Sequence, residues 1–176
     1  MSRDTHPELY YVPYEAFLAD LEAVARKVEA DSWNPDFLVG IGRGGLVPAA
    51  YLAHRTGITL LSVDYSSGDK EFATDLLVKL AHKSASGVRI LIIDDINDSG
   101  GTINKLRETL RANGGAEANI RTAVLINNVS SAAQAEYAGT DMDRTDDKRW
   151  FVFPWEAVAP RTTLLVEAGE VPERLA

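Results

Sequence analysis

The sequence predicts an α/β fold with a mostly parallel central sheet flanked by helices. Short aliphatic runs of strand length alternate along the chain with segments of helical periodicity, and turn residues separate them. The clearest run, Val88–Ile93, is apolar almost throughout, which is typical of a parallel strand covered on both faces. Strands that alternate with helices in this way form parallel sheets with right-handed crossovers.

The first half of the chain predicts two helices and two strands. A helix is expected over residues 14–30, where apolar side chains recur at helical spacing: Phe17, Leu21, Val24, Ala25 and Val28. A strand over Phe37–Ile41 follows the turn at residues 33–36 and is broken by Gly42–Gly45. The next elements are a helix over Leu46–Arg55, closed by Gly57 as its C-cap, and a strand over Ile58–Val63.

The second half is less uniform. Residues 66–87 have no single pattern, and Ala73–Leu80 fits either a helix or a strand. The elements expected beyond the strand at 88–93 are a helix from Thr102 to about Ala112, a strand over Arg121–Ile126, a helix over Ser131–Tyr137, a polar loop over Gly139–Arg149 and late strands over Trp150–Phe153 and Thr163–Val166.

The bulk properties favour one soluble domain over residues 1–176, because the chain has 176 residues and no repeat or linker. It has no cysteine, which excludes disulfides and cysteine zinc sites. No apolar run reaches the ~18 residues of a membrane span and no signal segment is evident, so the expected location is cytoplasmic. The net charge of -8 opposes a general nucleic-acid partner.

An acidic pair and a small-residue loop follow the strand at 88–93. In open parallel sheets, ligands bind beyond the carboxyl ends of the strands, and this segment lies at such an end. Ser99–Thr102 can offer several backbone N–H groups, two hydroxyls and a helix N-terminus to one phosphate. Because carboxylates repel phosphate, Asp94 and Asp95 are expected to contact sugar hydroxyls or a hydrated magnesium ion instead.

A second glycine-containing turn, Gly42–Gly45, also follows a strand and opens a helix. Its free backbone amides and the forked donors of Arg43 suit another anion. A simple helix-packing turn explains this pattern equally well when it is taken alone.

Ile90–Thr102 resembles the signature of type I phosphoribosyltransferases: an aliphatic strand, two acidic residues, two variable residues and then Asp-Thr/Ser-Gly-x-Thr. The resemblance implies that family's fold, with a small C-terminal hood at about residues 139–160. It also implies transfer of the 5-phosphoribosyl group from phosphoribosyl pyrophosphate (PRPP) to a base. Asp94 and Asp95 would bind the ribose hydroxyls directly or through Mg²⁺, which Asp95 could hold through water. The 5′-phosphate would be cradled by Asp98, Ser99, Gly100, Gly101 and Thr102.

The resemblance also assigns catalytic roles. Asp98 would exchange a proton with the base, and Arg43 would act with Gly42 and Gly44 on the pyrophosphate. Residues 66–83 take the place of the family's flexible catalytic loop. The lysines of that loop that could reach the pyrophosphate are Lys70, Lys79 and Lys83.

Trp150–Glu156 resembles the base-binding hood of bacterial xanthine-guanine phosphoribosyltransferases, which reads Trp-x-x-x-Pro-Trp-Asp. This implies that Trp150 stacks on a purine, that the Phe151 backbone contacts its edge, and that Glu156 approaches an exocyclic group or a metal. The alternative is a hydrophobic C-terminal cluster that packs on the core.

One position departs from the 6-oxopurine members, in which a lysine after the strand equivalent to 122–126 donates to the 6-oxo group. Here Asn127 stands at that position, and an amide can donate or accept. Guanine, xanthine and hypoxanthine are the favoured acceptors. The alternatives are another acceptor base and a non-catalytic nucleotide-binding regulator. The resemblance further suggests a homo-dimer or tetramer, for which Tyr10, Tyr11 and Tyr14 could provide an interface.

Overall fold

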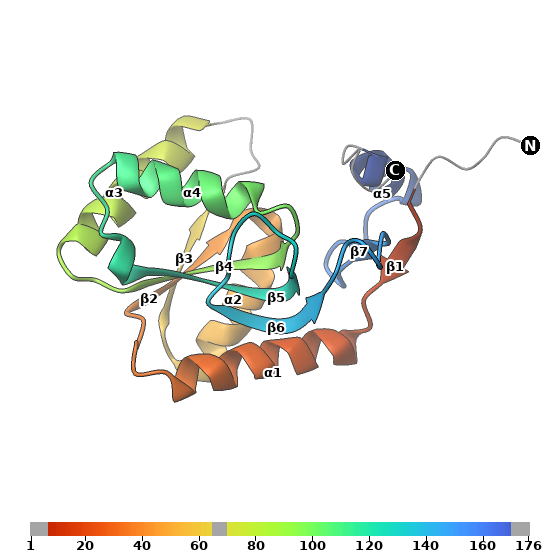
Figure 1. Ribbon diagram of the computed structural model, residues 1–176, viewed down its shortest axis with the longest axis horizontal. Coiled ribbons are helices and arrows are strands. Elements are labelled where there is room, and N and C mark those ends of the chain that lie inside the picture. Colours follow the sequence, from red (N-terminus) through yellow and green to blue (C-terminus); the bar gives the residue numbers. More distant parts are fainter. Residues whose placement is uncertain (1–6, 65–69, 170–176) are drawn as a thin grey trace, which may run out of the picture.

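The computed structural model describes residues 7–64 and 70–169, and its centre is a five-stranded parallel sheet (Figure 1). The strands lie in the order β3-β2-β4-β5-β6, and every neighbouring pair is parallel. Their bounds are β2 Phe37–Ile41, β3 Thr59–Val63, β4 Ile90–Asn97, β5 Ile120–Asn128 and β6 Tyr137–Met142. The predicted α/β class is therefore confirmed. β4 and β5 extend beyond the aliphatic runs from which they were predicted.

Helices cover both faces of this sheet. α1 (Tyr14–Ala30) and α2 (Gly42–Thr56) share one buried cluster with the sheet, whereas α3 (Lys70–Ala85) and α4 (Gly101–Ala112) share another. Figure 1 shows α1 running beneath β6 and α4 on the opposite side of the sheet. A single turn of 3₁₀ helix, η1 (Glu117–Asn119), leads into β5.

α1 buries the apolar residues that its periodicity predicted: Phe17, Leu21, Val24, Ala25 and Val28. Gly57 ends α2 in the left-handed region, with φ of 74°, as expected for a glycine C-cap. The ambiguous 73–80 segment lies inside the helix α3, so its helical interpretation is the correct one.

A separate two-stranded parallel sheet joins the two ends of the described chain. β1 (Leu9–Tyr11), which was not expected, pairs with β7 (Trp150–Val152), and α5 (Arg161–Gly169) follows. Figure 1 shows these three elements together at one end of the molecule. Of the segment predicted as a hood, residues 139–142 lie in β6 of the main sheet.

Three local predictions were wrong, and tertiary contacts explain two of them. Residues 131–136 are irregular with bends rather than helical, because their backbone N–H groups bond to other segments: Ala132 N–H to Ser99 O, and Glu136 N–H to Thr122 O. Residues 139–142 are strand rather than loop. There the sheet passes so close to α1 that a Cβ at Gly139 would lie 2.9 Å from the Asp20 backbone.

The third error is the late strand over 163–166, which is part of α5. Its helical pattern is short: Leu164 and Ala168, four residues apart, are both buried. Pro160 begins the turn by accepting the Leu164 N–H at 3.2 Å. Thr162, Thr163 and Val166 are β-branched, so local propensity favoured a strand, whereas the segment packs as a helix.

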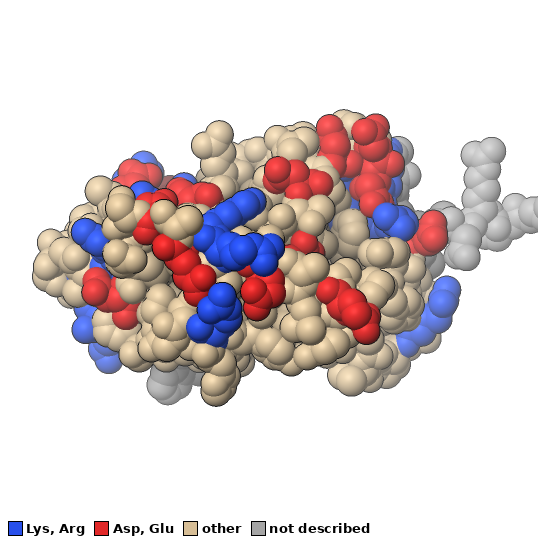
Figure 2. Space-filling model, turned by 90° about the horizontal axis from the view of Figure 1, so that it is seen from below, with Lys and Arg blue, Asp and Glu red and all other residues tan. Residues whose placement is uncertain are grey.

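None of the helices in the described part of the chain has the length and apolarity needed to cross a membrane. On the face that carries α1, lysine and arginine side chains are interleaved with acidic ones (Figure 2). Ion pairs join α1 to α2, because Arg55 of α2 pairs with Glu22 and Glu29 of α1.

Candidate active site

The first turn of α2 lies directly against the acidic pair of β4. β2 and β4 are neighbours in the sheet, so the Gly42–Gly45 turn that follows β2 meets the carboxyl end of β4. A Cβ on Gly44 would overlap the Asp95 carboxylate, and one on Gly45 would overlap the Ile93 carbonyl. Close approach therefore favours glycine at both positions, and two motifs about fifty residues apart meet at one edge of the sheet.

The Gly42–Gly45 turn is part of helix α2 and not a break before it. α2 begins at Gly42 and no side chain caps it, so its first N–H groups have no partner within the helix. The side chain of Arg43 is 86% exposed and lies 3.9 Å from Glu167 of α5. This end of α2 thus presents backbone donors and a solvated cation beside the acidic pair.

Asp94 and Asp95 are half-buried carboxylates within β4. Each accepts the N–H of the next residue, Asp94 at 3.0 Å and Asp95 at 2.7 Å. Burial raises the pKa of Asp94 to about 7. Burial, then the Asp94 charge and then the Glu156 charge raise the pKa of Asp95 well above its ordinary value. The protein alone therefore provides little compensation for negative charge here.

Glu156 reaches the same region from the turn after β7. Its carboxylate accepts the Phe153 N–H at 2.9 Å and is near enough to Asp95 to raise the pKa of that residue. Burial raises the pKa of Glu156 itself, while the Phe153 N–H and Arg43 act in the opposite direction. The predicted metal or base ligand Glu156 is therefore close to the predicted metal ligand Asp95.

The acidic pair fits a hydrated magnesium ion. Mg²⁺ prefers oxygen ligands, keeps several waters and is commonly held by one or two carboxylates together with substrate phosphates. Among residues 7–64 and 70–169, no group of three or more acidic, histidine or cysteine side chains forms a ready-made metal cage. Asp94 and Asp95 would thus serve a cation that depends on substrate for its remaining ligands.

The predicted phosphate loop, residues 98–102, leads into the uncapped N-terminus of α4. Gly100 is the N-cap with φ of 86°, in the left-handed region that favours glycine. A Cβ there would also lie 2.5 Å from the Ala133 backbone nitrogen. Gly101 N–H has one long contact, 3.3 Å from the Ser99 hydroxyl. The loop is therefore fixed by packing from behind, and its helix-end donors suit an anion.

Asn127 lies at the end of β5 with its side-chain amide already engaged. Its oxygen accepts from Asn97 at 2.8 Å, and its nitrogen donates to Asp141 at 2.9 Å. Asn97 is 1% exposed and also donates to the Ala133 carbonyl. The side chain predicted to contact a base is thus a link in a chain across the ends of β4, β5 and β6.

Asp98 forms a bidentate ion pair that was not expected. Arg144 Nε donates to one carboxylate oxygen at 2.8 Å and Nη2 to the other at 3.2 Å. The guanidinium lies 4.9 Å from the centre of the Phe151 ring. Arg144 sits in the polar 139–149 run, where nothing in the local pattern distinguishes it from a solvated loop residue.

Asn128 connects the phosphate loop to the 143–149 loop. Its amide donates to the Asp98 carbonyl at 2.9 Å, while its oxygen accepts the Arg144 N–H at 3.1 Å. Asn128 is 6% exposed, which marks it as a built-in connector and not a surface residue. In the sequence, only the position of Asn128 next to Asn127 pointed to a connecting role for it.

The aromatic residues of the Trp150–Glu156 segment divide into two groups. Phe151 contacts Tyr10 of β1 edge to face at 5.6 Å, and Trp150 accompanies it in β7, half-buried. Phe153 and Trp155 stack at 4.9 Å, and Trp155 contacts Phe17 of α1. The second group therefore packs on the core, as the alternative interpretation expected of the whole segment.

The segment at 66–83, predicted as a catalytic loop, is only partly described. Residues 65–69 and the side chain of Lys70 lie outside the described part. The remainder is helix α3, in which Lys79 is exposed and Lys83 lies 5.3 Å from the Phe37 ring. Since Phe37 begins β2, Lys83 lies at the amino edge of the sheet, opposite the acidic pair.

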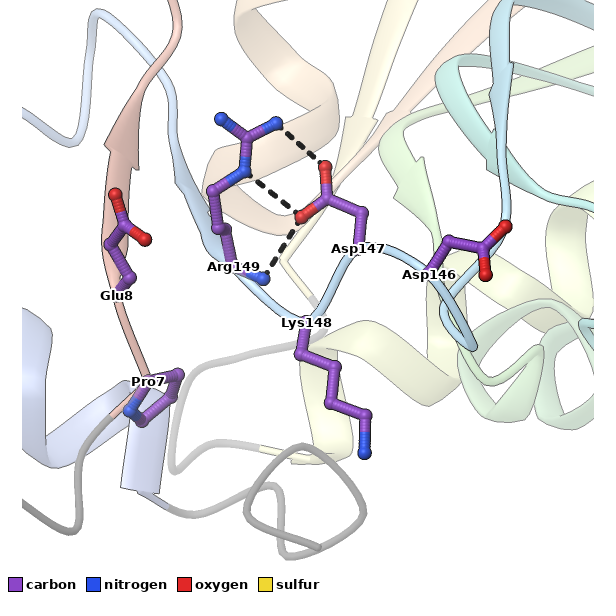
Figure 3. A pocket seen from close by; sticks show the side chains of 6 residues that line it. All are labelled: Pro7, Glu8, Asp146, Asp147, Lys148 and Arg149. Atoms are coloured by element: carbon purple, nitrogen blue, oxygen red, sulfur yellow. Dashed lines mark hydrogen bonds and ion pairs between the residues drawn. The ribbon is translucent and has the colours of Figure 1, made fainter.

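A pocket of about 530 Å³ opens beside β1 and is lined by Pro7, Glu8, Asp146, Asp147, Lys148 and Arg149 (Figure 3). Arg149 donates to the Asp147 carboxylate from Nε at 3.0 Å and from Nη2 at 2.7 Å. The pocket contains none of the predicted site residues, so its position does not identify the reaction centre.

Comparisons with known proteins agree with this geometry. Residues 11–159 match the family model described as "Phosphoribosyl transferase domain". A purine phosphoribosyltransferase from Pyrococcus horikoshii Ot3 is 24% identical, with a TM-score of 0.65 over 87% of this chain and 97% of that chain. A Helicobacter pylori xanthine-guanine-hypoxanthine phosphoribosyltransferase is 20% identical, with a TM-score of 0.60 over 85% and 94%. A Neisseria gonorrhoeae hypothetical protein solved with bound ppGpp is 21% identical, with a TM-score of 0.64 over 93% and 98%.

The family model spans most of the chain and includes the Gly42–Gly45 turn, the acidic pair, the phosphate loop and Glu156. The solved structures share the fold that brings these segments together. The chain therefore belongs to the type I phosphoribosyltransferase family of enzymes.

Proposed function

We propose that this enzyme transfers the 5-phosphoribosyl group from PRPP to a purine base, with a 6-oxopurine as the favoured acceptor. The observation that carries the proposal is the contact between the Gly42–Gly45 turn and Asp95. It sets two uncapped helix N-termini, those of α2 and α4, on either side of one acidic pair. PRPP has the matching order of groups: pyrophosphate, ribose hydroxyls and 5′-phosphate.

Each part of the donor has a candidate partner. The N–H groups of residues 99–102 and the hydroxyls of Ser99 and Thr102 would hold the 5′-phosphate. Asp94 and Asp95 would hold the ribose hydroxyls and a hydrated Mg²⁺, which neutralises charge on the pyrophosphate when bound. Gly42–Gly44 and Arg43 would contact the pyrophosphate. Binding at the two anion ends positions C1 between them.

In the reaction, the bond between C1 and the pyrophosphate oxygen breaks while a bond forms between C1 and a base nitrogen. The base loses a ring N–H proton when this bond forms, and we assign the Asp98 carboxylate to accept it. Arg43 and the α2 backbone donors stabilise the negative charge that develops on the leaving oxygen.

The purine acceptor is supported by the Trp150–Glu156 pattern and by the purine phosphoribosyltransferases among the structural neighbours. Asn127 favours a different acceptor, because its amide is bonded to Asn97 and Asp141. The acceptor must therefore be tested over a panel of bases.

The test is pyrophosphate release from PRPP with Mg²⁺, measured with guanine, xanthine, hypoxanthine, adenine, uracil and no base. We expect release with one or more 6-oxopurines and the corresponding nucleotide as product. Release with uracil alone would reject the purine assignment. If PRPP binds but no base of the panel supports release, the acceptor lies outside the panel or the protein is a nucleotide-binding regulator.

A further inference from the structure

Arg144 is the most deeply engaged arginine at the candidate active site. Its side chain is 12% exposed, and that of its partner Asp98 is 19% exposed. Burial lowers the pKa of Arg144 to about 10, which leaves it a cation at neutral pH. The guanidinium lies between the phosphate loop, which carries Asp98, and Phe151 of the Trp150–Glu156 segment.

The donors of Arg144 can be counted. A guanidinium has five N–H donors. Nε and Nη2 each donate once to Asp98, and Nη1 donates to the Asp147 carbonyl at 3.1 Å and to the Arg149 carbonyl at 2.6 Å. Among the described residues, one N–H of Nη2 is thus left without a protein acceptor.

We propose that Arg144 recognises a carbonyl oxygen of the acceptor base and thereby determines base specificity. This inference rests on the proposed function. A base joined to C1 must lie beyond the ribose, between the phosphate loop and the Trp150–Glu156 segment, and Arg144 spans these two. Its remaining N–H is a donor that complements a carbonyl oxygen on the edge of a base.

The chemistry of the neighbouring residues supports the same assignment. Asn127 uses its amide oxygen to accept from Asn97 and one of its two amide N–H groups to donate to Asp141, and it carries no charge. Arg144 therefore provides the cationic donor that Asn127 does not. An amino group in place of the carbonyl, as in adenine, would set donor against donor and leave the remaining N–H of Arg144 without an acceptor.

A purely structural function is the competing explanation. The bonds from Nη1 to the 147 and 149 carbonyls shape the 143–149 loop, and the ion pair ties that loop to the phosphate loop. Removing Arg144 would then weaken every ligand of the site equally. A carbonyl-recognition function predicts a loss confined to ligands that carry the carbonyl.

The experiment compares two probes that differ at one atom group: inosine 5′-monophosphate and purine riboside 5′-monophosphate, which has hydrogen in place of the 6-oxo group. Affinities are measured by titration calorimetry with the wild type and Arg144→Gln. We expect the wild type to prefer inosine 5′-monophosphate, and Arg144→Gln to lose about 10- to 100-fold in affinity for it. Binding of purine riboside 5′-monophosphate should change by no more than about 3-fold.

Arg149→Gln is the matched control. Arg149 lies in the same segment, pairs with Asp147 and covers the Tyr10 ring at 4.1 Å, and within the described part of the chain its side chain does not bond to the phosphate loop. It should affect both probes equally. Arg144→Lys keeps a charge and a donor with less disturbance, so it should retain part of the preference even if Arg144→Gln unfolds.

Equal losses for both probes in Arg144→Gln, or a wild type without preference, would overturn the inference. Its failure can be separated from that of the proposed reaction. A wild type that prefers the carbonyl probe through Arg144, yet releases no pyrophosphate with any base, retains the recognition and refutes the transfer. If the wild type releases pyrophosphate but Arg144→Gln keeps the same preference between the probes, the transfer reaction is retained and the recognition by Arg144 is refuted.

Discussion

At the scale of single residues, the site depends on a few carboxylates whose neighbours differ. Asp95 lies among Asp94, Glu156 and the backbone of Gly44, where further negative charge is unfavourable and a cation is favoured. Asp98, four residues past Asp94, lies beside the cation Arg144. The same side-chain type can therefore serve a metal and sugar in one place and a base in the other.

Asp95→Asn keeps the shape of the side chain and removes its charge. We expect PRPP binding in the presence of Mg²⁺ to weaken by at least about 10-fold, because an ionic ligand becomes a neutral one. Titration calorimetry measures this. Asp36→Asn is the control, since Asp36 caps the Arg89 N–H at the opposite edge of the sheet. Unaltered PRPP affinity in Asp95→Asn would contradict the assignment.

Asp98→Asn tests the proton acceptor. We expect the turnover number to fall by about 100-fold or more, as for other general bases, while PRPP binding is retained. Steady-state kinetics with the preferred base gives the first quantity and calorimetry the second. Since the change also weakens the pairing of Arg144, the acceptor KM should rise. A normal turnover number would remove Asp98 from proton transfer.

At the scale of elements, the site is formed where strands end and helices begin. α2 begins directly after β2, and the loop after β4 leads into α4, both without side-chain caps. Segment 131–133 supports that loop from behind, through the Ala132 N–H to Ser99 O bond and the close approach of Ala133 to Gly100. The phosphate loop is thus fixed by a segment that has no predicted role of its own.

Two glycine variants measure this support. Gly100→Ala places a Cβ both in a left-handed conformation, with φ of 86°, and 2.5 Å from Ala133 N. Gly87→Ala has a similar φ of 95° but meets nothing within 4 Å. Urea denaturation should show a loss of about 1 kcal/mol for Gly87→Ala and a clearly larger one for Gly100→Ala. Equal losses of stability in the two variants would mean that segment 131–133 can move to accommodate the added Cβ and does not fix the phosphate loop.

At the scale of the whole molecule, α1 is tied to the sheet by a charged network as well as by its apolar face. Asp31, just past α1, pairs with Arg121 of β5 at 2.6 Å and accepts the Tyr137 hydroxyl of β6 at 3.0 Å. The Trp33 N–H first, and then Arg121 and Tyr137, hold the pKa of Asp31 below its ordinary value. Three elements that are distant in sequence thus meet at one carboxylate.

The sign of the pH dependence follows from this lowered pKa. Asp31 stabilises the fold above the ordinary carboxyl pKa near 4, and that contribution is lost as the pH falls through the lower folded value. Asp31→Asn should therefore lower Tm at pH 7. The difference in Tm between the variant and the wild type should become smaller below about pH 3. Thermal unfolding between pH 2 and 8, with the α3 surface variant Asp75→Asn as control, checks this. A gap of constant size would refute the ionic contribution.

Much of the fold could be predicted because it depends on periodicity. The apolar stripe of α1 and the aliphatic runs of β2 and β4 identify buried faces without knowledge of their partners. The predictions were wrong for three segments, 131–137, 139–142 and 163–166. These segments are short, and their conformation depends on contacts with distant parts of the chain. β1 was missed for the same reason, since only its pairing with β7 makes it a strand.

The sequence by itself determined the class of the fold, the two glycine turns and the acidic pair, because these depend on spacing along one strand and the turn after it. Only the tertiary structure showed that Gly44 lies against Asp95, that Asn127 is bonded within the sheet edge, and that Arg144 is paired with Asp98. The physical reason is separation along the chain. A bond between residues 98 and 144 leaves no periodic trace in either segment, and it exists only because parallel strands bring their carboxyl ends to one edge.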